Sequence, residues 1–66
     1  MKARVNGELR DLPDGTTVAA VLALLGAPGS GVAVAVDGEV VPRAEWHRTA
    51  VPDGGTVEVL TAVQGG

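Results

Sequence analysis

One segment of the chain has the periodicity of an amphipathic helix, and that segment is short. Within residues 18–25, apolar side chains recur at positions i, i+3, i+4 and i+7 and would form one stripe. Thr16 or Thr17 can cap the start of this helix, and Gly26 followed by Pro28 favours its end at residue 25. A single short helix can bury its stripe only against a sheet, so the remaining apolar residues must supply one.

Two hairpins are predicted, one on each side of the helix. Asn6-Gly7 lies between two runs with an extended pattern, and Asp37-Gly38 lies between an apolar run and a short run ended by Pro42. Both central residues of a type I′ turn need a positive φ, which makes Asn-Gly and Asp-Gly strong hairpin signals.

Three further segments complete the pattern. Residues 32–36 include no polar side chain, which is typical of a central strand covered on both faces. Residues 43–50 lack a clear period, so we expect a short helical turn and a loop around Trp46 that cross the sheet. Residues 56–63 have the composition of a last strand.

This order of elements has one compact solution, a sheet that grips a single helix. We predict an α+β fold of the β-grasp, or ubiquitin-like, type, with a mixed four- to five-stranded sheet packed on one main helix. The first and last strands would pair in parallel at the sheet centre. The domain would occupy residues 1–63, and residues 64–66 would form a flexible C-terminal tail.

The composition excludes several classes of protein. The chain has 66 residues and no cysteine, so one small domain must fold without disulfides, thiolate metal ligands or a thiol nucleophile. Its net charge of −3, with only five Lys and Arg residues, argues against a nucleic-acid partner. No apolar run approaches the length of a membrane span and none follows Met1 as in a signal peptide, so we expect no membrane partner and a cytoplasmic location.

Few side chains carry chemistry. His47 is the only histidine, and with no Cys or second His beside it we expect a surface residue and no metal site. Ser30 has no candidate base near it, and the glycine-rich residues 26–31 follow a helix instead of preceding one, so they do not form a phosphate loop. Trp46 is most simply a core or lid residue over a small aliphatic core, and a partner-binding anchor is the less favoured alternative. We therefore expect no enzyme activity.

Most of the carboxylates fall in predicted turns or at outward strand positions. They are expected to be solvated turn residues, although together they could form an acidic face for a basic partner. They are Asp11, Asp14, Asp37, Glu39, Asp53 and Glu58.

The last residues of the sequence are Gly65-Gly66. A glycine pair can enter a narrow channel and present a bare carboxylate to an enzyme, but glycines are also common in frayed chain ends, and the residues alone favour neither interpretation. Beside this tail, Leu60 and Ala62 would lie on the opposite face of the last strand from Val57 and Val59. They form a candidate partner surface.

The arrangement of short motifs resembles that of the ThiS family, the sulfur carrier proteins of thiamin (thiazole) biosynthesis. The likeness covers essentially the whole chain. Its elements are Val5-Asn6-Gly7-Glu8, Thr17-Val18 with Leu22 and Leu25, the run from Val34 through Asp37-Gly38 to Val41-Pro42-Arg43, Trp46, Asp53-Gly54 and Val63-Gln64-Gly65-Gly66.

This resemblance implies a carrier that is a co-substrate of other enzymes. An E1-like adenylyltransferase of the ThiF type would use ATP and Mg to adenylate Gly66, with Val63, Gln64 and Gly65 as the tail, and no cofactor would be bound by the carrier itself. A cysteine desulfurase or sulfurtransferase would supply sulfur, giving a thiocarboxylate. Thiazole synthase of the ThiG type would accept the sulfur.

Three alternatives remain open. Molybdopterin-synthase small subunits share the terminal glycine pair, so the carrier could serve that pathway. A ubiquitin-like covalent modifier would use the same activated Gly66 to acylate a lysine amine. The domain could also be a passive binding module with an incidental tail.

Overall fold

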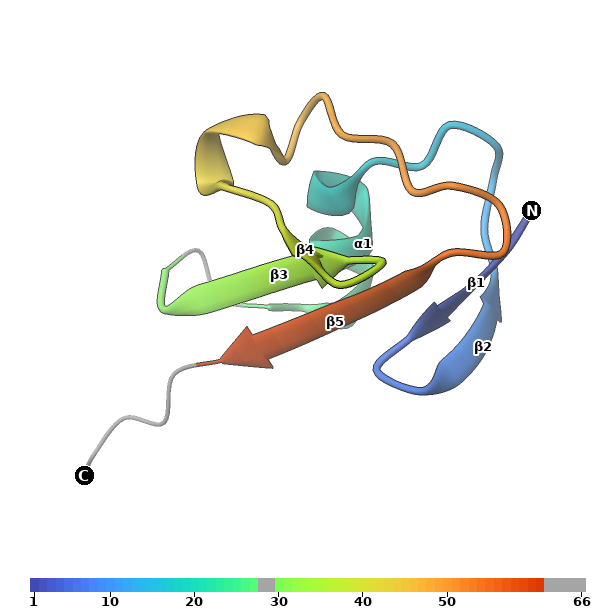
Figure 1. Ribbon diagram of the computed structural model, residues 1–66, viewed down its shortest axis with the longest axis horizontal. Coiled ribbons are helices and arrows are strands. Elements are labelled where there is room, and N and C mark those ends of the chain that lie inside the picture. The colour runs from blue at the N-terminus through green and yellow to red at the C-terminus, as the bar shows by residue number, and fades with distance from the viewer. Residues whose placement is uncertain (28–29, 62–66) are drawn as a thin grey trace.

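A five-stranded sheet with one helix packed on one of its faces makes up the protein (Figure 1). The computed structural model describes residues 1–27 and 30–61. The elements, in chain order, are β1 Lys2–Val5, β2 Glu8–Asp11, α1 Val18–Leu25, β3 Val32–Val36, β4 Glu39–Val40, the 3-10 helix η1 Arg43–Glu45 and β5 Thr56–Thr61.

The strands lie in the order β2-β1-β5-β3-β4. The first and last strands, β1 and β5, are parallel neighbours with β5 at the sheet centre, whereas the pairs β1–β2, β3–β5 and β3–β4 are antiparallel. The predicted α+β, β-grasp fold with a mixed sheet is therefore confirmed. The predicted extension of β5 to residue 63 lies outside the described residues.

Local signals determine both ends of α1. The Thr17 hydroxyl oxygen accepts a hydrogen bond from the Ala20 backbone N–H at 3.2 Å, so of the two candidate caps it is Thr17 that caps the helix. The hydroxyl of Thr16 instead donates to the carbonyl oxygen of Pro13 at 2.6 Å. Gly26 ends the helix with a φ of 66°, a left-handed conformation that glycine adopts without strain.

Both hairpin turns have the predicted geometry. Asn6 and Gly7 have φ values of 52° and 82°, and Asp37 and Gly38 have φ values of 50° and 83°. The first turn gives the register Val5↔Glu8, and the second gives Val36↔Glu39. Strand β4 ends at Val40, one residue earlier than expected, although the Val41 N–H still donates to the Val34 carbonyl oxygen at 2.8 Å.

The core is aliphatic and lies between α1 and one face of the sheet. Valine dominates it, in keeping with a chain that has no Phe or Tyr. Its buried residues are Ala3, Val5, Leu12, Val18, Val21, Leu22, Val34, Val51 and Val57.

The prediction that strand β3 is covered on both faces is wrong. Strand β3 is an interior strand, paired with β5 and β4, but although Val34 is buried, Ala33 on the other face is exposed. The reason is that the one helix covers one face only. Alanine at positions 33 and 35 makes the uninterrupted apolar run compatible with solvent on the other face, because a methyl group exposes little apolar area.

The segment after β4 crosses to the start of the helix. As expected, residues 43–50 begin with a helical turn, η1, and continue through a loop that contains Trp46. The carbonyl oxygens of Trp46 and Thr49 accept hydrogen bonds from the N–H groups of Ala19 and Val18, at 3.0 and 2.9 Å. N–H groups in the first turn of a helix have no acceptor inside the helix, so the loop supplies the acceptors for two N–H groups at the start of α1.

Candidate functional site

The sheet face opposite α1 carries exposed apolar side chains on neighbouring strands. The register places Leu60 beside Ala33, and Ala35 beside Val40, on neighbouring strands. Leu60 and Val40 are 69% and 75% exposed. We call the group formed by Ala33, Ala35, Val40 and Leu60 the open sheet face.

The open sheet face exists because alternation in β5 and β3 is strict. Val57 and Val34 point toward α1 and are buried, so their neighbours in the chain point to the other side. Leu60 was predicted on this side from the sequence, and its exposure confirms that placement. Val40, Ala33 and Ala35 were missed as members, because their proximity to Leu60 depends on the strand order and register.

Charged side chains flank the apolar centre of this face on the side of β1 and β2. Glu58 on β5 lies directly beside Ala35, and Arg4 on β1 lies opposite Thr56. Lys2 and Asp11, at the far edge, approach each other to 3.8 Å. An exposed apolar centre with a polar rim is the usual layout of a protein-binding surface.

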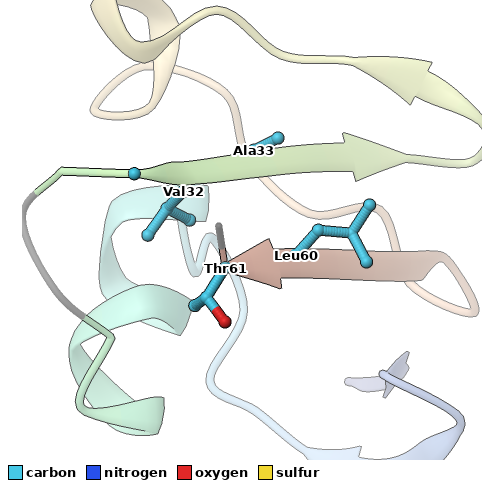
Figure 2. A pocket seen from close by; sticks show the side chains of 5 residues that line it. Val32, Ala33, Leu60 and Thr61 are labelled. Carbon is cyan, nitrogen blue, oxygen red and sulfur yellow. The ribbon is translucent and has the colours of Figure 1, made fainter. Parts of the chain in front are cut away.

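A shallow hollow lies where the open sheet face meets the end of β5 (Figure 2). Its volume is about 350 Å³, and its lining includes Ala33 and Leu60 from the open face with Val32 and Thr61 from the adjoining positions. The side chains of Leu60 and Thr61 point in different directions from β5 in Figure 2. Because Thr61 lines the hollow and is the last residue of β5, the hollow is adjacent to the point at which the chain continues into residues 62–66.

The other predicted site residues fall in that continuation. Ala62, Val63, Gln64, Gly65 and Gly66 lie outside the described residues. Their roles as partner surface, tail and sulfur-bearing terminus stay predictions. What the described residues establish is that β5, the central strand, extends to Thr61.

Two of the turn carboxylates accept hydrogen bonds from backbone N–H groups of distant strands, which the sequence did not reveal. Asp37 accepts a hydrogen bond from the Thr56 N–H at 2.9 Å, and Asp53 accepts one from the Lys2 N–H, also at 2.9 Å. Each therefore links a turn to a strand far away in the sequence. Asn6 also links a turn to a distant strand, since its Oδ1 accepts a hydrogen bond from the Val59 N–H at 2.8 Å. This side-chain oxygen takes the place of a backbone acceptor from β1, which ends at Val5.

His47 and Trp46 belong to no metal-binding cluster of the described residues. His47 is exposed, as predicted, and Trp46 is half-buried with its Nε1 donating to the Val41 carbonyl oxygen at 2.9 Å. Among residues 1–27 and 30–61, no three side chains of the His, Cys, Asp and Glu types gather closely enough to hold a metal ion. Over the same residues, no helix is long and apolar enough to cross a membrane.

A mixed sheet that grips one helix, with parallel first and last strands and a central last strand leading into the tail, defines a ubiquitin-like protein of the β-grasp class. Comparison with known proteins gives the family within that class. The family model of the ThiS family matches residues 3–66, and the chain belongs to that family.

A solved structure and a curated relative agree with this assignment. The crystal structure of the thiamine biosynthesis protein ThiS from Geobacter metallireducens is 32% identical, covers 100% of both chains and superposes with a TM-score of 0.82. A thiazole synthase from Paramagnetospirillum magneticum (strain ATCC 700264 / AMB-1) is 38% identical over 66 residues, which are 100% of this chain and 20% of the relative. Family membership and these matches support a sulfur carrier in thiamine biosynthesis.

Proposed function

We propose that this protein carries sulfur for the thiazole ring of thiamin as a thiocarboxylate on Gly66. The observation that carries the proposal is the match of the ThiS family over residues 3–66, which includes the glycine pair. In this role the folded body is recognised by partner enzymes, and residues 64–66 enter their active sites. The protein is then a co-substrate and not a catalyst.

The chemistry requires activation because a carboxylate oxygen is a poor leaving group. The Gly66 carboxylate attacks the α-phosphorus of ATP, and pyrophosphate leaves, so that AMP becomes the leaving group on the acyl carbon. A persulfide sulfur then displaces AMP. A partner thiol cleaves the sulfur–sulfur bond, which leaves the thiocarboxylate on Gly66 and a disulfide on the partner. Gly65 allows the tail to pass through a narrow channel into the active site, because it adds no side chain next to the reacting carbonyl.

Three partners follow from this sequence of reactions. An E1-like adenylyltransferase of the ThiF type uses ATP and Mg to adenylate Gly66, a cysteine desulfurase or sulfurtransferase supplies the persulfide, and a thiazole synthase of the ThiG type accepts the sulfur. The last assignment is supported by the relative named thiazole synthase, which holds a segment similar to this whole chain within a protein about five times as long. The expected cytoplasmic location stays a prediction.

The open sheet face is the surface on which we propose that the activating enzyme docks. It is apolar, it has a polar rim, and it adjoins the end of β5, so a partner bound there is close to the start of the tail. Docking the body while the tail is in the active site makes capture of the carboxylate effectively intramolecular.

Intact-mass spectrometry tests the proposal. The protein is co-expressed with the ThiF-type adenylyltransferase and the sulfur donor encoded in the same genome, and is then purified and weighed. The expected mass gain corresponds to one oxygen exchanged for sulfur, and it is absent from a variant that lacks Gly66. Deletion of Gly66 is also expected to abolish thiamin-independent growth of the host strain.

Other outcomes would assign the alternatives. Conjugates to lysines of other proteins would identify a covalent modifier, and a thiocarboxylate used only for molybdopterin would identify a carrier of that pathway. An unchanged mass in sulfur-replete cells, together with normal thiamin synthesis without Gly66, would contradict the proposal.

A further inference from the structure

A second hollow lies on the helix side of the molecule, between α1 and η1. Its volume is about 270 Å³. Ala19, Leu22 and Ala23 from α1 form its apolar floor, and Arg43, Trp46 and His47 form its wall. We call it the α1–η1 hollow. The sheet separates it from the open sheet face, because α1 packs on the opposite side of the strands.

The aromatic wall of this hollow is fixed in place. The indole Nε1 of Trp46 donates to the Val41 carbonyl oxygen at 2.9 Å, and the Trp46 carbonyl oxygen accepts from the Ala19 N–H at 3.0 Å. The ring is therefore held to the chain before η1, and its backbone is held to α1. A ring that is already ordered loses little conformational entropy when a partner packs against it.

The charge at the hollow is opposite to that of the whole chain. The net charge is −3, yet the hollow is lined by Arg43 and by no carboxylate of the described residues. Arg48 is paired with Glu45 at 2.9 Å. Arg43 is exposed, its guanidinium carbon lies 6.0 Å from the Trp46 ring centroid, and it forms no ion pair with any carboxylate in residues 1–27 and 30–61. The available charge beside the apolar floor is therefore positive.

The shape of the hollow favours a protein side chain over a small molecule. Small-molecule sites usually enclose about 300–1,000 Å³, whereas this hollow is smaller and open to solvent. Tryptophan and arginine, which both contribute to its wall, are among the residue types that most often carry the binding energy of protein interfaces.

From these observations we infer that the α1–η1 hollow binds an acidic segment of a partner protein. One apolar side chain of that segment packs on the floor against Trp46, and a neighbouring carboxylate pairs with Arg43. The inference concerns binding at this face alone and is independent of the proposed function. A partner held here leaves the open sheet face free.

Two capped peptides of matched size provide the probes. N-acetyl-Glu-Phe-Glu-amide has the inferred chemistry, and N-acetyl-Lys-Phe-Lys-amide keeps the apolar side chain but reverses the charge. Each is titrated into the ¹⁵N-labelled protein while amide and indole signals are followed by NMR. The acidic peptide is expected to shift the Trp46 indole and Ala23 amide signals saturably, and the basic peptide to bind at least about fivefold more weakly.

Variants with matched controls locate the contact. Arg43→Gln removes the available charge and is expected to weaken binding of the acidic peptide roughly fivefold or more. Arg48→Gln removes an arginine that is already paired with Glu45, and is expected to change binding of the same peptide less than twofold. Ala23→Glu places bulk and negative charge on the floor and is expected to abolish the shifts. Ala20→Glu makes the same change at an exposed position of α1 outside the hollow.

The alternatives are distinguishable from one another. Equal binding of both peptides, shifts centred on Leu60 and Val40, no saturable shift, or undiminished binding by Arg43→Gln would each overturn the inference. None of these results depends on whether Gly66 becomes a thiocarboxylate, so the peptide titration and the intact-mass experiment can fail separately.

Discussion

At the scale of single residues, Gly55 leaves very little room for a side chain. A Cβ atom there would lie 2.8 Å from the Pro52 backbone oxygen and 2.9 Å from the Pro52 Cγ. The Gly55 N–H donates to the same Pro52 oxygen at 2.9 Å, and the Gly55 carbonyl oxygen accepts from the Arg4 N–H. The turn before β5 is therefore closed tightly onto β1.

We expect Gly55→Ala to lower the free energy of unfolding by about 1–3 kcal/mol, because the backbone of the turn must shift to make room for the methyl group. Urea denaturation followed by Trp46 fluorescence measures the loss. Ser30→Ala, at an exposed loop position, is the control and is expected to change stability by less than about 0.5 kcal/mol. Equal stability of the two variants would contradict the tight turn.

Asn6 has two structural roles at one position. Its φ is 52°, and its side-chain oxygen accepts the Val59 N–H at 2.8 Å. Asn6→Gly keeps the backbone freedom but removes the acceptor, and is expected to destabilise by about 0.5–1.5 kcal/mol. Asn6→Asp keeps both roles, so it should be nearly neutral. Thermal unfolding of the two variants separates the side-chain bond from the backbone requirement.

At the scale of elements, α1 is stabilised at its start by contacts of two kinds. Thr17 caps it from within the segment, whereas Trp46 and Thr49 supply backbone oxygens from the crossing loop. Only the first contact is visible in the sequence, because only the cap is local. The crossing loop connects η1 to β5, and β5 lies at the centre of the sheet.

Thr17→Ala is expected to lower the free energy of unfolding by about 1 kcal/mol, since one N–H of the first turn loses its acceptor. Thr17→Ser retains the hydroxyl oxygen and is expected to recover most of that loss. Urea titration by circular dichroism measures both variants. A Thr17→Ala protein as stable as the parent would show that the loop contacts alone suffice.

The difference between local contacts and contacts with distant residues explains which elements could be predicted. The helix bounds and both hairpin turns follow from Thr17, Gly26, Asn6-Gly7 and Asp37-Gly38, which act within a few residues of themselves. The exposure of Ala33 could not be predicted, because an apolar run looks the same whether one or two layers cover it. Membership of Val40 in the open sheet face likewise required the pairing of β4 with β3.

At the scale of the whole molecule, two exposed leucines offer a direct test of the docking surface. Leu60 is 69% exposed on the open sheet face, and Leu24 is 61% exposed on the outer side of α1. The sequence predicted the exposure of Leu60 but could not show that Leu60 has Ala33 beside it.

We expect Leu60→Glu to lower the rate of Gly66 adenylation by the ThiF-type enzyme about tenfold or more, because a buried interface position then carries an unpaired charge. Leu24→Glu makes the same change on a surface of similar exposure and is expected to leave that rate within about twofold. Pyrophosphate release under limiting carrier measures the rate. Equal rates for the two variants would place the docking surface elsewhere.

The Asn6-Gly7 turn also makes the molecule subject to chemical ageing. Asparagine followed by glycine cyclises to a succinimide when the glycine nitrogen attacks the side-chain carbonyl, and hydrolysis yields aspartate or isoaspartate. Aspartate at position 6 would preserve the oxygen that accepts the Val59 N–H. Isoaspartate adds a methylene to the backbone inside a two-residue turn, which would displace the register of β1 and β2. Old preparations should therefore contain two populations of equal mass, one native-like and one with a damaged hairpin.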